Sequence, residues 1–271
     1  MGKFFTAELK PDIINGDVSV IQNANKSHLD VGAGTIIFDW TEITVPRGAN
    51  LLRSILAVVN CEDGTYHASN LVDYVLLFAK SVNGVAPSSF GTIGSGSTGT
   101  FDLKDHLIGS YTLQSAAGAG TNPDQKSGPW HIVYTAPSGV IHNNAGDRLT
   151  SGALPMILQT DDVTGSDGTS KLYVCGVQQA ARGYQTGVIV NGAITSDTED
   201  TIAVDGVGAT KIFSVGDTVY LHDVDTALGT IKSLTDTSIV LNAAIAGGTD
   251  IDDDDELLNA NPIKITLGFE Q

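Results

Sequence analysis

The sequence predicts an all-β protein, in which a β-sandwich or jelly-roll-like host domain carries a small acidic β-barrel or β-sandwich module near the C-terminus. Three observations favour this fold class. Short runs rich in Val, Ile, Thr and aromatic residues are separated by Gly, Asn and Asp turn signals. Glycine is frequent, with 31 residues, and Met is scarce, with 2. Long runs of Glu, Lys, Leu and Ala at helical spacing are missing.

The chain is long enough for one large or two small domains. Its 271 residues are 41% hydrophobic, which is sufficient to fill a substantial core. We expect three parts. Residues 1–30 form an extended N-terminal arm and a first strand, residues 31–186 together with 259–271 form the sandwich, and residues 187–258 form the small acidic module.

Strand-like runs joined by turns and long loops fill the host domain, a spacing typical of sandwiches. The run over residues 51–60 is strongly apolar and indicates a core strand, with a short helix as the alternative. Pro155 restricts its run to a sheet edge or a bulge, because proline has no N–H to donate to a neighbouring strand. A short helical turn is expected within residues 101–113. The other runs cover residues 34–40, 42–46, 72–81, 130–135, 150–159 and 171–178.

The most regular stretch of the chain lies in the module, over residues 213–242. It contains three β-like runs, with a two-residue turn at Thr235-Asp236 between the last two. Short runs around tight turns suit a small barrel or sandwich of about five strands.

A last strand is predicted over residues 261–269, after the module. Its residues alternate regularly, so that Ile263, Ile265 and Leu267 share one face. A strand this regular needs a sheet partner. We therefore expect it to return to the host sheet, which makes residues 187–258 an insertion.

Acidic residues dominate the charge, and they are unevenly distributed. The chain has a formal net charge of -17, with 31 acids and 14 Lys and Arg. The module holds 14 of the acids and only Lys211 and Lys232, a net charge of -12, which leaves -5 for the other residues. Nucleic acid is an unexpected partner, because binding it needs basic residues to neutralise phosphates. The same charge disfavours anionic membrane surfaces, and no apolar run is long enough to span a bilayer.

Two cysteines, Cys61 and Cys175, lie in apolar runs. We interpret them as buried free thiols that behave as small hydrophobic residues, with a single disulfide as the alternative.

Motifs that carry catalysis are missing from the sequence. The Gly/Ser loop over residues 94–99 does not fit the nucleophile elbow, and the short Gly-x-Gly runs lack the third glycine of a phosphate loop. Histidines occur singly, without metal-ligand spacing. They are His28, His67, His106, His131, His142 and His222. We therefore predict no catalytic, cofactor-binding or metal-binding residue, and no enzyme activity.

Two acidic loops and two tryptophans have alternative interpretations. The loops, from Asp250 to Glu256 and from Asp161 to Asp167, lack the EF-hand pattern and indicate solvated turns, with a loose Ca²⁺ site as the alternative. Trp40 and Trp130 lie in strand-like runs, which favours core packing over a sugar-binding platform.

The runs over residues 215–221, 228–234 and 238–241 carry a family resemblance. They read VGDTVYL, LGTIKSL and SIVL. This sequence pattern resembles that of small β-modules in virion proteins of tailed phages, including marine phages and cyanophages. Residues 1–186 are similar, more loosely, to β-sandwich proteins associated with phage heads.

The resemblance implies a non-enzymatic virion structural protein of the capsid-decoration, or cement, type. Such a protein binds the major capsid protein on the outer surface of the head as a homotrimer or homodimer, without a cofactor. It is made in the host cytoplasm without a signal peptide. The alternatives are a neck or tail structural protein, a module that binds host-surface glycans, and an enzyme of an unrecognised type. The resemblance includes no receptor-binding or shell-binding motif, so it assigns no binding role to individual residues of this chain.

Overall fold

Regular alternation of buried and half-buried side chains along the last strand shows how the chain builds a two-layer sheet structure. In the strand β18 (Ile263–Glu270), the side chains of Ile263, Ile265, Leu267 and Phe269 are buried, and those between them are half-buried. One face of this strand therefore packs on a core and the other faces outward. The computed structural model describes residues 2–14, 30–31, 33–61, 72–94, 103–113, 125–127, 131–136, 154–160, 168–180, 182–184, 188–194, 198–222, 226–247 and 249–271.

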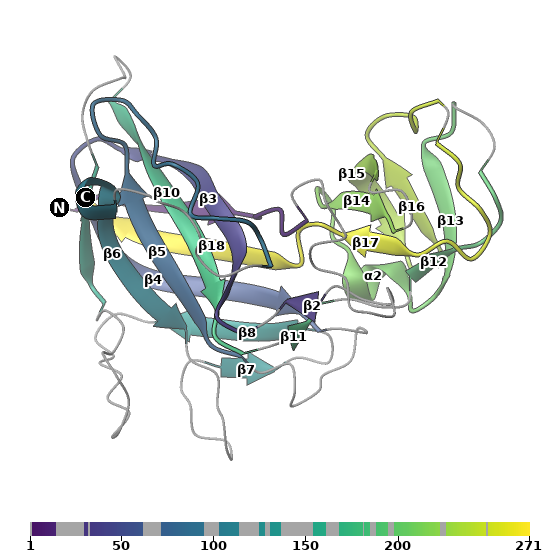
Figure 1. Ribbon diagram of the computed structural model, residues 1–271, viewed down its shortest axis with the longest axis horizontal. Helices are drawn as coiled ribbons and strands as arrows, with labels where there is room; N and C mark the ends of the chain where they lie inside the picture. The colour runs from purple at the N-terminus through teal and green to yellow at the C-terminus, as the bar shows by residue number, and fades with distance from the viewer. Residues whose placement is uncertain are drawn as a thin grey trace.

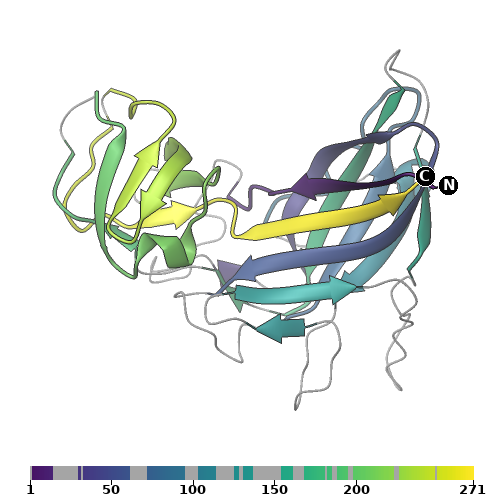
Figure 2. The same ribbon diagram turned by 180° about the vertical axis from the view of Figure 1, so that it is seen from behind.

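The first layer of the sandwich is an antiparallel sheet with β18 near its centre. Its strand order is β1 (Phe4–Leu9), β18, β4 (Ala49–Asn60), β8 (His131–Ala136) and β7 (Gln125–Ser127), and β9 (Met156–Gln159) pairs with the beginning of β4. Figure 2 shows this sheet in front of the second layer, so that its outward side faces the viewer.

The second layer is a four-stranded antiparallel sheet. It consists of β3 (Thr35–Pro46), β10 (Thr169–Gln178), β5 (Tyr74–Lys80) and β6 (Leu107–Leu113), in that order. The single-turn helix α1 (Leu103–His106) precedes β6, and the short strands β2 (Asp30–Val31) and β11 (Arg182–Gly183) pair with each other.

Aromatic side chains fill much of the space between the two layers. Tyr134 packs edge to face against Tyr74, with ring centroids 5.4 Å apart. Their hydroxyl groups are satisfied inside the core, because Tyr134 donates to the carbonyl of Val72 and Tyr74 hydrogen-bonds to Tyr184. β10 pairs irregularly with β3 around Gly176. There the ring of Phe38 occupies the space that a side chain at Gly176 would need.

The module is a small barrel with its own aliphatic core. Its strands, in spatial order, are β12 (Val188–Val190), β13 (Thr201–Gly206), β16 (Ser238–Leu241), β15 (Thr226–Thr235), β14 (Thr218–Leu221) and β17 (Leu257–Asn259). A bridge between Ile189 and Glu256 brings the last strand next to the first, so the sheet nearly closes on itself. The single-turn helix α2 (Ala209–Ile212) connects β13 to the turn before β14.

The chain returns from the barrel into the middle of the first sandwich sheet. β18 pairs with β1 on one side and with β4 on the other. In Figure 1, the barrel lies at one end of the sandwich and the two chain ends lie together at the other. The prediction of an all-β fold with a small β-module inserted near the C-terminus is therefore confirmed.

The short helical turn expected within residues 101–113 is present at residues 103–106, and the segment continues as β6. Other local expectations differ from the structure. The barrel has six strands rather than about five, and the helix α2 was not predicted. Residues 213–217 form a turn instead of a strand, because Gly216 has a φ of 84° and Asp217 accepts a hydrogen bond from the N–H of Ser214. Half of the expected N-terminal arm, residues 15–29, lies outside the described residues.

Candidate functional site

The outward side of the first sandwich sheet exposes apolar side chains. We call this surface the outer face. Phe4 on β1 is 74% exposed, Ile157 on β9 is 66% exposed and Leu56 on β4 is 40% exposed. The face is formed by Phe4, Thr6, Glu8, Leu51, Arg53, Ser54, Leu56, Val58, Ile157, Lys264, Thr266, Gly268 and Glu270.

Strand register places four of these residues in one row across the sheet. Phe4 lies opposite Glu270, Glu270 opposite Leu51, and Leu51 opposite Ile157. Directly opposite side chains of an antiparallel pair lie about 5 Å apart, so the row is continuous. It consists of three apolar side chains and one carboxylate.

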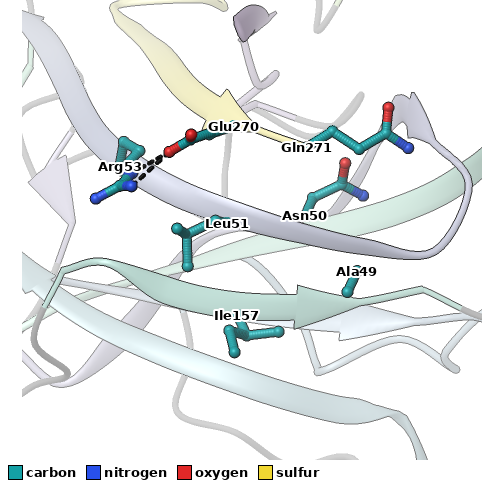
Figure 3. Close-up of a pocket in the computed structure, with 7 residues that line it drawn as sticks. All are labelled: Ala49, Asn50, Leu51, Arg53, Ile157, Glu270 and Gln271. Carbon is teal, nitrogen blue, oxygen red and sulfur yellow. Dashed lines mark hydrogen bonds and ion pairs between the residues drawn. The ribbon is translucent and has the colours of Figure 1, made fainter. Parts of the chain in front are cut away.

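A shallow pocket of about 350 Å³ lies on this row. Figure 3 shows Leu51 and Ile157 on neighbouring strands, with Arg53 and Glu270 joined by hydrogen bonds beside them. The Nε and Nη2 atoms of Arg53 lie 2.7 Å and 2.5 Å from the same carboxylate oxygen, Oε2 of Glu270. The pocket thus has apolar side chains at its base and one ion pair at its edge. Such a surface is suited to contact with another protein.

Charges on the outer face are paired with one another. Besides Arg53 and Glu270, the Lys264 Nζ atom lies 3.1 Å from Oε2 of Glu8 on the neighbouring strand. The face therefore has two acids and two bases. Each exposed pair contributes only about 0–1 kcal/mol to stability, but together they leave the face without net charge.

A glycine on β18 lies within the outer face. A Cβ atom on Gly268 would contact the side-chain oxygen of Ser54 on the opposite strand. Because Gly268 has no side chain, Ser54 can lie over β18, and β18 itself presents no side chain at this position.

The joint between sandwich and barrel is a second candidate, and its centre is the buried carboxylate of Asp217. Asp217 is 2% exposed. Its Oδ1 atom accepts a hydrogen bond of 2.8 Å from Lys10 Nζ, which also donates to the carbonyl of Val215. Its Oδ2 atom accepts from the N–H of Ser214 and from the amide of Asn259. A carboxylate with this many donors is strongly held in place.

Asparagine side chains extend this network into the sandwich. The amides of Asn60, on β4, and Asn259 both donate to the carbonyl of Ile212 at the end of α2. The amide of Asn261 donates to the carbonyl of Lys10, and its oxygen accepts from the N–H of Thr218. Segments from three distant parts of the chain are thus fixed to one another.

Apolar contacts reinforce the joint. Tyr220 and Leu258, on barrel strands β14 and β17, pack into the core cluster of the sandwich rather than that of the barrel. A pocket of about 290 Å³ also lies at the joint, and its lysines already contact acids: Lys10 contacts Asp217, and Lys264 contacts Glu8. We therefore assign the joint a structural role, which is to hold the barrel at a fixed orientation.

The histidines are not brought together where they are described. His106 hydrogen-bonds through Nδ1 to the carbonyl of Lys80, and His222 is buried at the end of β14. His28, His67, His142 and the side chain of His131 lie outside the described residues. In the part of the chain that the structure describes, no group of three His, Cys, Asp or Glu side chains is placed to hold a metal ion.

The acidic loop from Asp250 to Glu256 forms turns in which its own carboxylates accept backbone hydrogen bonds. Asp253 accepts from the N–H of Gly192, and Asp255 accepts from the N–H of Asp252. The Asp255 carboxylate thus closes a turn within the loop, and the Asp253 carboxylate fastens the loop to Gly192. The second loop, from Asp161 to Asp167, lies outside the described residues.

Both cysteines are buried free thiols, as predicted. Burial, and secondarily the nearby carboxylate of Asp39, raises the pKa of the Cys175 thiol far above its ordinary value. A thiol that stays protonated is a poor nucleophile, so Cys175 is chemically inert in the folded chain.

Trp40 is half-buried and packs edge to face on Phe90, with ring centroids 5.8 Å apart. Its indole N–H donates to the carbonyl of Ser88. This arrangement fits the predicted packing role and fixes the ring in place. Trp130 lies outside the described residues.

Sequence reasoning missed both the outer face and the Asp217 network. A signal for the face was present in β4, whose residues are apolar on both sides of the strand from Ile55 to Val59. In an antiparallel sheet with one solvated side, apolar and polar residues are expected to alternate along each strand. For Asp217, the Val-Gly-Asp turn indicated a loop but not its distant partners.

Among the described residues, none of the helices has the length and apolar character needed to cross a membrane. Comparison with known proteins found no protein-family model and no curated protein that matches this chain.

Proposed function

We propose that this chain is a non-enzymatic virion structural protein of the capsid-decoration type. In this role the sandwich attaches to the outer surface of an assembled head, and the barrel extends away from it. The resemblance of residues 215–241 to phage virion modules suggests the class of protein. The observation that carries the proposal is the segregation of charge between the two β-structures.

The barrel region and the sandwich region differ greatly in charge. Residues 187–258 have a net charge of -12, whereas the remaining 199 residues have a net charge of -5. A protein surface approaching the chain meets less electrostatic repulsion on the sandwich than on the barrel. The sandwich is therefore the attaching part and the barrel the solvated part.

The fixed joint supports the same role. The hydrogen bonds of Asp217 and the packing of Tyr220 hold the barrel rigidly at one end of the sandwich. A rigid chain loses little conformational entropy when it attaches to a shell. A protein that binds only the assembled, expanded shell stabilises that shell by mass action.

The glycan-binding alternative receives less support from the described residues. Sugar sites usually need an aromatic ring with a free face, and Trp40 is fixed against Phe90 with its N–H already used. We therefore keep the decoration role as the proposal.

Sedimentation tests the proposal directly. Purified full-length protein is mixed with empty, undecorated expanded heads of the virus that encodes it, and with unexpanded heads as the control. We expect it to sediment with the expanded heads in a saturable ratio and to raise their melting temperature. If it stays in the supernatant at concentrations well above micromolar, or sediments equally with unrelated particles, the decoration role is wrong.

A further inference from the structure

We propose that the outer face is a self-association surface, on which a second copy of this chain docks face to face. This inference goes beyond the decoration role and does not depend on it. It rests on the charge, the apolar exposure and the shape of that face.

Charge restricts where two copies can meet. Each copy carries a net charge of -17, so two copies repel each other at most orientations. Contact is least opposed where the surface has no net charge. On the outer face the ion pairs Arg53–Glu270 and Glu8–Lys264 balance each other. Each pair is closed within one copy, so neither leaves a lone charge to be buried by docking.

Exposed apolar side chains are concentrated on the same face. Of the five large apolar side chains that are exposed among the described residues, three belong to it, namely Phe4, Leu56 and Ile157. Of the other two, Val215 borders the face at the joint pocket, beside Val58 and Lys264, and Val85 lies in the turn after β5. A cluster of this kind, surrounded by polar residues, is typical of a protein contact surface.

Size and shape suit a sheet-on-sheet contact. With 8 residues in β18, the face is about 27 Å long, and four strands make it about 19 Å wide, which gives a footprint of about 500 Å². Two copies would thus bury about 1,000 Å² in total, near the lower limit for a specific interface. At Gly268 only the short side chain of Ser54 lies over β18, which leaves room for side chains of a second copy to interdigitate.

A second copy is the occupant that fits best, because the same balanced surface serves both sides. Identical patches that pack on each other generate a closed two-fold dimer. Since the interface is small, we expect a dissociation constant on the order of micromolar.

Matched charge substitutions test the face. Ile157→Asp and Val85→Asp each replace an apolar side chain of nearly equal exposure, 66% and 64%, and each adds one negative charge. Sedimentation equilibrium should show a dimer for the wild type and for V85D, and at least a tenfold weaker dimer for I157D. Circular dichroism confirms that each variant is folded. A monomeric wild type at about 100 µM, or equal association of the two variants, would overturn the proposal.

Cross-linking provides an independent test, because the native cysteines are buried. Leu56 lies near the middle of the face, so L56C should form a disulfide-linked dimer within minutes of adding an oxidant such as diamide. V85C should remain monomeric under the same conditions. If both variants cross-link at the same rate, or neither does, the face is not where the copies meet. A trimer that I157D dissociates would also contradict face-to-face pairing. All of these measurements are made without heads, so they succeed or fail independently of the sedimentation test for decoration.

Discussion

The sandwich and the barrel are built from the same kind of antiparallel strands, yet they present different surfaces. The sandwich core contains aromatic side chains such as Phe38, Tyr111 and Tyr134, and its first sheet exposes a balanced, apolar outer face. The core of the barrel, in the described residues, is aliphatic apart from Phe213, and its region carries most of the negative charge. The difference shows that a nearly closed sheet can carry polar groups over its whole outer surface. An open sheet of a sandwich instead has one broad outward side that can contact another protein.

We expect substitution at the joint between sandwich and barrel to destabilise the chain most. Asp217→Ala removes the acceptor of Lys10, Ser214 and Asn259 together and leaves the buried amide of Asn259 with one partner fewer. We expect a loss of about 3–5 kcal/mol in unfolding free energy, measured by urea denaturation. Glu8→Ala, which removes an exposed ion pair with Lys264, should cost less than about 1 kcal/mol. Equal losses for the two variants would show that the joint is not held by Asp217.

Independence of the two cores is tested inside the barrel. Leu241 is 1% exposed in the barrel core, so Leu241→Ala should destabilise the barrel by about 2–5 kcal/mol. Hydrogen exchange should then rise in β15 and β16, while β4, β10 and β18 keep their protection. If protection falls equally in both parts, the sandwich and barrel unfold as one unit.

The sandwich core is packed tightly beneath β10, at Gly176. Gly176→Ala would place a methyl group against the ring of Phe38, which is itself buried. We expect a loss of about 1–3 kcal/mol, measured by thermal unfolding. At Gly109 the added methyl group would meet mainly the flexible end of Met156, so Gly109→Ala should cost less. A larger loss at Gly109 than at Gly176 would contradict this interpretation.

The smallest effect concerns a tyrosine on the second sheet. Partial burial, and then the nearby carboxylate of Glu42, raise the pKa of Tyr173 above its ordinary value of 10.0. Because the phenol ionises at a lower pH in the unfolded chain, its contribution to stability is present below about pH 10 and is lost as the pH rises further.

Ultraviolet titration measures this shift, with Tyr173→Phe used to assign the signal. Glu42→Gln should lower the midpoint for Tyr173 without returning it fully to the ordinary value, because burial is the larger cause. An unchanged midpoint would mean that the carboxylate has no influence on the phenol.

The fold class could be predicted from the sequence because alternation and turn signals are local. Ile263, Ile265 and Leu267 share one face in any strand, and that face needs a sheet to cover it. The return of β18 to the sandwich follows from this requirement.

The candidate surfaces could not be predicted, because they depend on contacts between distant segments. Lys10 and Asp217 are far apart in the sequence, and only the return of β18 between β1 and β4 brings them together. The exposure of Ile157 depends on how β9 pairs with β4. Pro155 predicted that its run lies at a sheet edge or a bulge, but that argument does not say which side chains point outward.

The bridge between Ile189 and Glu256 has a further consequence for how such a chain can change. Because it joins the first and last strands of the barrel, the start of β12 lies beside β17, from which the chain returns to the sandwich. A different folded unit with neighbouring ends could replace the barrel without altering the order of strands in the sandwich. The position of the barrel is thus a site at which another domain can be inserted. A foreign domain grafted there should lie at the end of the sandwich opposite both chain ends.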